Sequence, residues 1–124
     1  MMTKLIEEVK ELVEREYGRA GAQHGLTFSS DHQAYAVILE EYQEAKTEIN
    51  QLEFKLSKFW DMVKRDADNY EKYGNLTSLY TTAIYAACEL IQVAAMAKKE
   101  ALTVCERGAT EELKREENEN DGKS

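Results

Sequence analysis

Apolar and polar residues alternate along most of this chain with the period of an α-helix. In residues 3–17 the apolar positions share one helix face and the acidic residues lie opposite. Residues 18–29 contain three glycines, which interrupt the pattern and predict a loop. Ser30, with Gln33 three positions later, is typical of a capping box. The pattern therefore predicts a short amphipathic helix, a loop and the start of a second helix at Ser30.

The longest regular pattern follows this cap. Its apolar residues are spaced alternately by three and four positions, as in the seam of a coiled coil. These residues are Tyr35, Ile38, Tyr42, Ala45, Ile49, Leu52, Leu56, Phe59 and Val63. No Gly or Pro interrupts them, so we expect one long helix that ends near Asp66. Residues 66–75 are polar and predict a loop, and residues 76–106 predict a third long helix that Gly108 ends.

The predicted fold is all-α. A short loop requires the two long helices to run antiparallel, so the chain forms a long-helix hairpin plus a short N-terminal helix. Leu39 and Trp60 lie off the seam, and residues 83–97 are apolar almost all round. A two-helix hairpin with one short extra helix cannot bury all of these apolar side chains within one chain. We therefore expect a homo-oligomer, a dimer or a tetramer, to complete a helical bundle.

Length and composition predict one domain. The chain has 124 residues, which is long enough for a real core. We expect a single helical domain in residues 1–107 and a disordered tail in residues 108–124, because the tail is polar and has few apolar residues. The formal net charge of −8 disfavours binding to duplex nucleic acid or to anionic membranes.

Cysteine usage and apolar stretches favour a cytoplasmic protein. If Cys88 and Cys105 share a helix they are about 25 Å apart, too far for a disulfide within one chain. Unpaired cysteines suit a reducing compartment. The N-terminus is amphipathic and acidic, unlike a signal peptide. The longest apolar stretch is shorter than a membrane span and has a glutamate at its centre, so we predict no membrane contact.

That glutamate, Glu89, is the only charged residue in residues 83–97. A buried carboxylate is costly unless a cation or a hydrogen-bond donor offsets it. Two interpretations stay open: Glu89 pairs with a structural Lys, Arg or Tyr, or it ligates a metal ion. Tyr85 precedes it by about one helical turn and Gln92 follows by about one turn, so the three residues form one polar stripe.

A second acidic group precedes it in the chain. Glu40, Glu41 and Glu44 form an EExxE motif, and Glu48 follows one turn later. Carboxylates three and four residues apart share a helix face, so two of them can bind one hard cation. The motif is short and also occurs in residues 7–11, on the outer face of the first helix, where it indicates a solvated surface.

The segment HQAYAVILEEYQEA, followed after a helical spacer by ELIQVAAMAKK, resembles the MazG-like all-α NTP pyrophosphatase superfamily, and within it small phage-encoded members. The resemblance covers roughly residues 24–102. It implies a hydrolase that uses Mg²⁺, with Mn²⁺ as an alternative, to cleave a nucleoside triphosphate into a monophosphate and pyrophosphate.

The resemblance also implies a set of site residues. Glu40, Glu41 and Glu44 match the EExxE motif of the family, and Glu89 matches the Glu of its later ExxD motif. Gln92 stands where the family has the Asp of that motif, and its neutral amide is a weaker Mg²⁺ ligand. These five residues are the expected metal ligands, and Glu41 or Glu44 is expected to orient or activate the attacking water. Gln92 leaves a second function open, a non-catalytic helical adaptor on the same scaffold.

Overall fold

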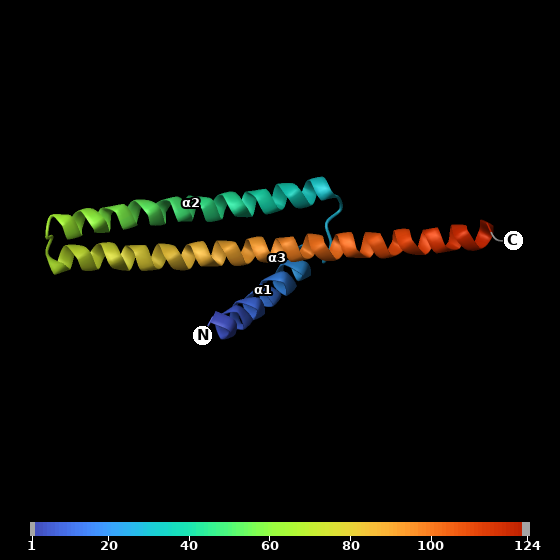
Figure 1. The fold of residues 1–124 in the computed structure, drawn as a ribbon, viewed down its shortest axis with the longest axis horizontal. Coiled ribbons are helices and arrows are strands. Elements are labelled where there is room, and N and C mark those ends of the chain that lie inside the picture. Colours follow the sequence, from blue (N-terminus) through green and yellow to red (C-terminus); the bar gives the residue numbers. More distant parts are fainter. Residues whose placement is uncertain (1, 123–124) are drawn as a thin grey trace. The chain divides into compact units, whose positions relative to one another are not determined.

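The computed structural model describes residues 2–122 and contains three helices. They are α1 (Met2–His24), α2 (Asp31–Lys64) and α3 (Asn69–Gly122), drawn in Figure 1. No strand occurs within residues 2–122. The predicted all-α class is confirmed.

Helix α1 is longer than the sequence pattern predicted. It continues through Gly18 and Gly21 to His24, where we expected an end near Tyr17. Isolated glycines inside a helix cost only about 1 kcal/mol each, so they weaken α1 without ending it. Gly25 ends it, because its φ of 89° lies in the left-handed region. The Gly25 N–H donates to the Gly21 carbonyl oxygen at 2.8 Å, as expected of a helix C-cap.

The predicted cap of α2 is present. The N–H of Gln33 donates to Ser30 Oγ at 3.1 Å. The side chain of Gln33 reaches back, and its Oε1 accepts the N–H of Ser29 at 2.8 Å. Backbone N–H groups at and just before the start of α2 are therefore satisfied by side chains, as the spacing of Ser30 and Gln33 indicated.

The turn between α2 and α3 is much shorter than the predicted loop over residues 66–75. Asp66 lies just after the end of α2 and has a φ of 54°, a left-handed conformation that Asp tolerates better than most residues. Asp68 starts the next helix, because its Oδ1 accepts the N–H of Glu71 at 2.8 Å. The expected loop residues from Asn69 onward therefore belong to α3.

The other end of α3 also lies beyond its predicted position. Gly108 does not end the helix, which continues to Gly122. Residues 109–119 contain five Glu together with Ala, Leu, Lys and Arg, all of which favour helix, and residues 108–119 are all exposed. Local hydrogen bonds hold this stretch, including that from Thr110 Oγ1 to the Glu106 carbonyl oxygen at 3.0 Å.

The chain divides into two compact units, one of residues Met1–Ala36 and Ala94–Ser124 and one of residues Val37–Val93. In the first unit, α1 and the start of α2 pack on α3. Phe28 is buried, its N–H donates to Thr103 Oγ1 at 3.2 Å, and the Lys99 ammonium lies 4.3 Å from its ring centroid. Ion pairs join Lys98 to Glu14 and Arg107 to Asp31.

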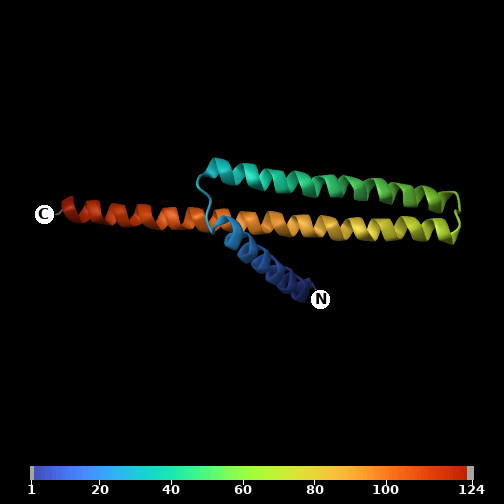
Figure 2. The same cartoon turned by 180° about the vertical axis from the view of Figure 1, so that it is seen from behind.

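In the unit Val37–Val93, α2 and α3 lie side by side and antiparallel (Figures 1 and 2). Their less exposed residues alternate by four and three, the spacing of a helix-pairing seam. We call these residues the seam. On α2 they are Glu41, Ala45, Glu48, Leu52, Lys55, Phe59 and Met62, and on α3 they are Asn75, Leu79, Thr82, Ala86, Glu89 and Val93.

The seam differs from the one that the sequence predicted. Ala45, Leu52 and Phe59 belong to both, but Tyr42 and Leu56 were expected to be buried and are 48% and 60% exposed. Their predecessors Glu41 and Lys55 face α3 instead. The polar seam is satisfied in places: Lys55 Nζ donates to Thr82 Oγ1 at 2.5 Å, and Asn75 Nδ2 donates to the Lys55 carbonyl oxygen at 3.1 Å.

This register leaves an apolar face on the hairpin. Each residue of this face follows a seam residue by one position. In an antiparallel pair of helices, the stripe on α2 and the stripe on α3 therefore lie on the same side of the hairpin. We call this the apolar face. It consists of Tyr42, Ile49, Leu56 and Val63 on α2 and of Leu76, Tyr80, Ala83, Ala87 and Leu90 on α3. All of these except the half-buried Ile49 are exposed.

By length and composition alone, α3 could cross a membrane. It is the one helix in the described part of the chain with an 18-residue window apolar enough for this, and 17% of that window is buried. We had expected the longest apolar stretch to be too short for a span. The core helix of a soluble protein meets the same criteria, and α3 carries Glu89 and the other seam residues as such a helix does. The absence of membrane contact stays a prediction.

Candidate functional site

Three glutamates from two helices converge in the unit Val37–Val93. Glu41 and Glu44 come from α2 and Glu89 comes from α3, and one carboxylate oxygen of each lies within 4.8 Å of the others. Glu41 and Glu89 are half-buried, whereas Glu44 is exposed. The structure thus brings two residues of the EExxE motif together with Glu89 within a single chain. We call these three residues the glutamate cluster.

The seam explains why these side chains meet. Glu41 and Glu89 both occupy seam positions, so each is directed toward the opposite helix. Glu44 lies almost one turn after Glu41 on the flank of α2. The neighbouring seam residues Ala45 and Ala86 are buried and small, which lets the two helices approach closely. The carboxylates are therefore positioned by helix pairing rather than by a loop.

Like charges and burial disfavour the ionised form of Glu89. Burial, then a hydrogen bond with Glu44 and then the charges of Glu44 and Glu48 raise the pKa of Glu89 above its ordinary value. Its Oε2 is buried and accepts no hydrogen bond. A divalent cation among these carboxylates would offset their mutual repulsion, and carboxylate oxygens are the ligands that Mg²⁺ prefers.

Two of the predicted ligands lie outside the glutamate cluster. Glu40 is exposed on α2 and does not join the three acids, because adjacent residues point about 100° apart around a helix. Gln92 is half-buried on α3, about one turn after Glu89. Glu44 and Gln92 each follow a seam residue by three positions, so both lie on the side of the hairpin away from the apolar face.

This side is polar along its length. The residues three positions after a seam residue are Glu44, Gln51 and Lys58 on α2 and Ser78, Tyr85 and Gln92 on α3. We call them the polar face. Glu44 and Gln92, which the sequence pattern singled out, lie at one end of this face. The other end, at Lys58 and Ser78, was not predicted, because the predicted seam lay at the wrong residues.

Sequence reasoning also missed a second acidic pair, in the unit Met1–Ala36 and Ala94–Ser124. Burial, followed by a hydrogen bond with Asp31, raises the pKa of Glu100. The same hydrogen bond and the guanidinium of Arg107 lower the pKa of Asp31. Glu100 is therefore the member of the pair that folding makes easier to protonate. Asp31 also pairs with Arg107, so this acidic pair already has a cationic partner.

No known protein family, curated protein or solved structure matches this chain. The resemblance to MazG-like proteins therefore rests on two short sequence motifs alone. Of the residues that the resemblance implies, Glu41, Glu44 and Glu89 are brought together.

The raised pKa of Glu89 predicts a pH dependence. Folding makes this carboxyl bind its proton more tightly, so its contribution to stability is present below the unfolded pKa and is lost as the pH rises through the folded pKa. We expect the melting temperature of the protein in chelator to fall between mildly acidic and neutral buffer. Circular dichroism melts should show a smaller fall in Glu89→Gln.

A matched variant separates this effect from that of the second acidic pair. Glu100→Gln removes the other acid whose pKa is raised and should reduce the fall in melting temperature by an amount that adds to the effect of Glu89→Gln. An identical pH slope in the wild type and in Glu89→Gln would contradict the proposed electrostatics of the glutamate cluster.

Proposed function

We propose that the protein is a Mg²⁺-dependent nucleoside triphosphate pyrophosphohydrolase of the MazG-like type. The observation that supports this is the convergence of Glu41, Glu44 and Glu89 within 4.8 Å. Two of these residues are three positions apart on one helix and the third comes from the antiparallel helix, so their oxygens surround one point. Mn²⁺ has the same preference for oxygen ligands and is a second candidate ion.

The residues have distinct roles in this proposal. Glu41, Glu44 and Glu89 hold the metal, and the Gln92 amide is a neutral ligand beside them. A metal ion held there would supply positive charge that polarises the phosphoryl oxygens and offsets their charge. Glu44, the exposed member, accepts a proton from the attacking water. The water oxygen bonds to the α-phosphorus and the bond from that phosphorus to the bridging oxygen breaks, which yields a monophosphate and pyrophosphate.

A non-catalytic helical adaptor is the second candidate function. Gln92 is the observation that favours it, because an amide in place of a carboxylate leaves the site with one negative charge fewer. The exposed apolar face would then serve as the binding surface of the adaptor. The two candidates differ in whether a divalent cation stabilises the folded chain.

We also propose that a second copy of the chain covers the apolar face, so that a dimer or a tetramer completes a helical bundle. No large side chain in the described part of the chain is fully buried, so a single copy lacks a dense core. The apolar face has the four-and-three spacing of a helix-pairing surface on α3. Such a face can pair with itself about a two-fold axis.

A cytoplasmic location belongs to the same proposal. Cys88 and Cys105 are free and exposed, which suits a reducing compartment. The charge of −8 disfavours duplex nucleic acid and anionic lipid as partners.

Metal-dependent stability and pyrophosphate release test the function. We expect Mg²⁺ or Mn²⁺ to raise the melting temperature above its value in chelator, because an ion that binds only the folded chain must stabilise it. We expect pyrophosphate release from at least one of the common ribonucleoside and deoxyribonucleoside triphosphates. Glu8→Gln, in the EExxE copy on α1, is the control that removes the same charge elsewhere. No shift with either ion, together with no release, would reject the enzyme and favour the adaptor.

A further inference from the structure

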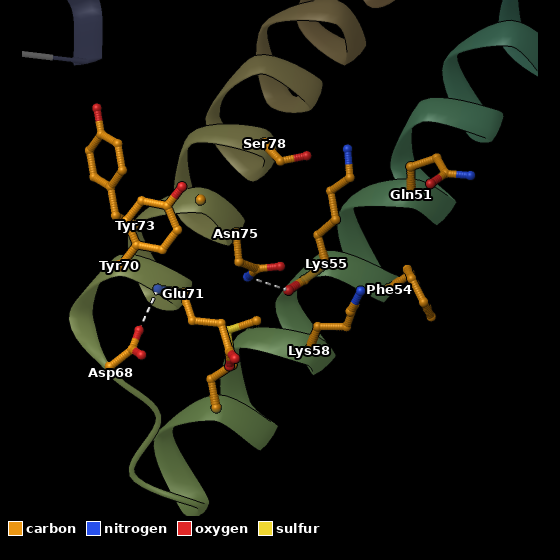
Figure 3. Close-up of a pocket in the computed structure, with 12 residues that line it drawn as sticks. Gln51, Phe54, Lys55, Lys58, Asp68, Tyr70, Glu71, Tyr73, Asn75 and Ser78 are labelled. Carbon is orange, nitrogen blue, oxygen red and sulfur yellow. Dashed lines mark hydrogen bonds between the residues drawn. The ribbon is translucent and has the colours of Figure 1, made fainter.

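A hollow of about 750 Å³ lies at the end of the hairpin next to its turn, within the unit Val37–Val93. Figure 3 shows Lys55 and Lys58 on α2 opposite Asn75 and Ser78 on α3. The hollow lies outside the glutamate cluster, since none of the three glutamates lines it. The proposed hydrolysis assigns it no role.

The hollow opens on the polar face. Gln51 and Lys58 of α2 and Ser78 of α3 belong both to this face and to the lining. Gln51 follows Glu44 by seven residues, so the hollow begins about 10 Å along α2 from the glutamate cluster. A ligand can therefore enter it from solvent without displacing the apolar face of the hairpin.

Formal charges balance in the lining of the hollow, where the acids and the lysines differ in their partners. Two acids line it, but Asp68 accepts the N–H of Glu71 at the start of α3, and Glu71 pairs with Arg65. The two lysines have no such partner: within residues 2–122, neither forms an ion pair. Lys55 Nζ donates to Thr82 Oγ1, and Lys58 Nζ lies 5.3 Å from the ring centroid of Phe54. Ammonium groups with remaining donors favour an anionic ligand.

Aromatic rings surround the same hollow. Phe54, Tyr70 and Tyr73 line it and are 60%, 89% and 69% exposed. Exposed rings beside a concave surface can stack on a flat ligand. The amide of Gln51 and the hydroxyl of Ser78 add hydrogen-bonding groups that can contact the edge of such a ring. The lining thus combines binding groups for an anion with binding groups for a flat polar ring.

We propose that this hollow binds a nucleoside monophosphate without a metal ion, with the phosphate on Lys55 and Lys58 and the base against the tyrosines. The proposal stands on the lining of the hollow and is independent of the hydrolysis proposed above. The same chemistry could be supplied by a free monophosphate or by the base end of a triphosphate held at the glutamate cluster. The experiment therefore separates these two sources.

The test uses the full chain in chelator and measures binding of AMP, GMP, CMP and UMP by calorimetry. At least one should bind saturably at one site per chain. Lys58→Gln should weaken that binding roughly tenfold, as loss of a charge-assisted contact does, while binding of the parent nucleoside changes little. Tyr73→Ala should weaken the binding of both the monophosphate and the nucleoside. Lys46→Gln, an exposed lysine of α2 outside the hollow, is the control and should bind like the wild type.

Glu89→Gln identifies the source of the ligand. It should bind the monophosphate in chelator as the wild type does, because Glu89 does not line the hollow. Loss of binding in Glu89→Gln would place the nucleotide at the glutamate cluster and overturn the proposal. No saturable binding of any of the four monophosphates, or equal binding by Lys58→Gln and Lys46→Gln, would overturn it as well. None of these results depends on whether Mg²⁺ binds.

Discussion

Glu89→Gln should leave the metal-free protein as stable as the wild type or more stable, and it should abolish stabilisation by Mg²⁺. Burial, Glu44 and Glu48 all raise the pKa of Glu89, so its charged form is unfavourable at neutral pH. Gln keeps the shape of the side chain, removes the charge and can donate its amide to a neighbouring carboxylate. Melting temperatures in chelator and in Mg²⁺ measure both effects, and pyrophosphate release measures activity.

The opposite sign is expected if Glu89 has a structural cationic partner. Removing one member of a buried ion pair costs about 3–5 kcal/mol, since the other charge is then left uncompensated. Glu89→Gln would then melt lower in chelator, and Mg²⁺ would have no effect on either protein. The ion pairs found within residues 2–122 do not include Glu89. Glu8→Gln controls for the change in net charge.

Gln92→Asp extends the same experiment. Gln92 lies about one turn after Glu89, on the polar face with Glu44, so a carboxylate there would add a fourth acid beside the cluster. On the enzyme proposal, the variant should melt lower in chelator but need less Mg²⁺ to recover, and it should hydrolyse a triphosphate faster. On the adaptor proposal, it should melt lower whether or not Mg²⁺ is present. Unchanged metal affinity would argue against the assigned ligands.

Periodicity was enough to predict the three helices but not the seam, and it was the resemblance that grouped Glu41 and Glu44 with Glu89. The predicted and observed seams share Ala45, Leu52 and Phe59 and differ by one position between these residues. The sequence pattern assigned the more apolar of two adjacent residues to the seam, and so it placed Leu56 there instead of Lys55. In the structure Lys55 reaches Thr82 and its backbone carbonyl accepts from an asparagine, so its burial is compensated by hydrogen bonds that no single-helix pattern contains.

The helix ends show a similar limit. Gly18, Gly25 and Gly108 all interrupt the apolar pattern, but only Gly25 has the positive φ that ends a helix. Which glycine adopts that conformation depends on what the following residues contact. The position of the turn at Asp66 then decides which residues of α3 face α2. The hollow between Lys58 and Ser78 depends on this register, and so the sequence alone did not predict it.

Charging the apolar face should separate the proposed dimer. We expect the wild type to sediment as a dimer or larger at micromolar-range concentration, with a melting temperature that rises with protein concentration. Leu56→Lys places an ammonium at the centre of the α2 stripe, where burial in an interface would leave the charge unpaired. It should sediment as a monomer, and its melting temperature should be lower and independent of concentration.

Gln43→Lys is the matched control, because it adds the same charge to an exposed position of α2 that lies on neither the seam nor the apolar face. It should assemble as the wild type does. A wild-type chain that sediments as a clean monomer would reject the second copy as the cover of this face. Recovery of the wild type with lipid vesicles, lost in Leu56→Lys, would instead show that the apolar stripe of α3 contacts a bilayer. Because the exposed stripe of α3 has the regular spacing of a helix-pairing surface, we expect one of these two partners to cover it.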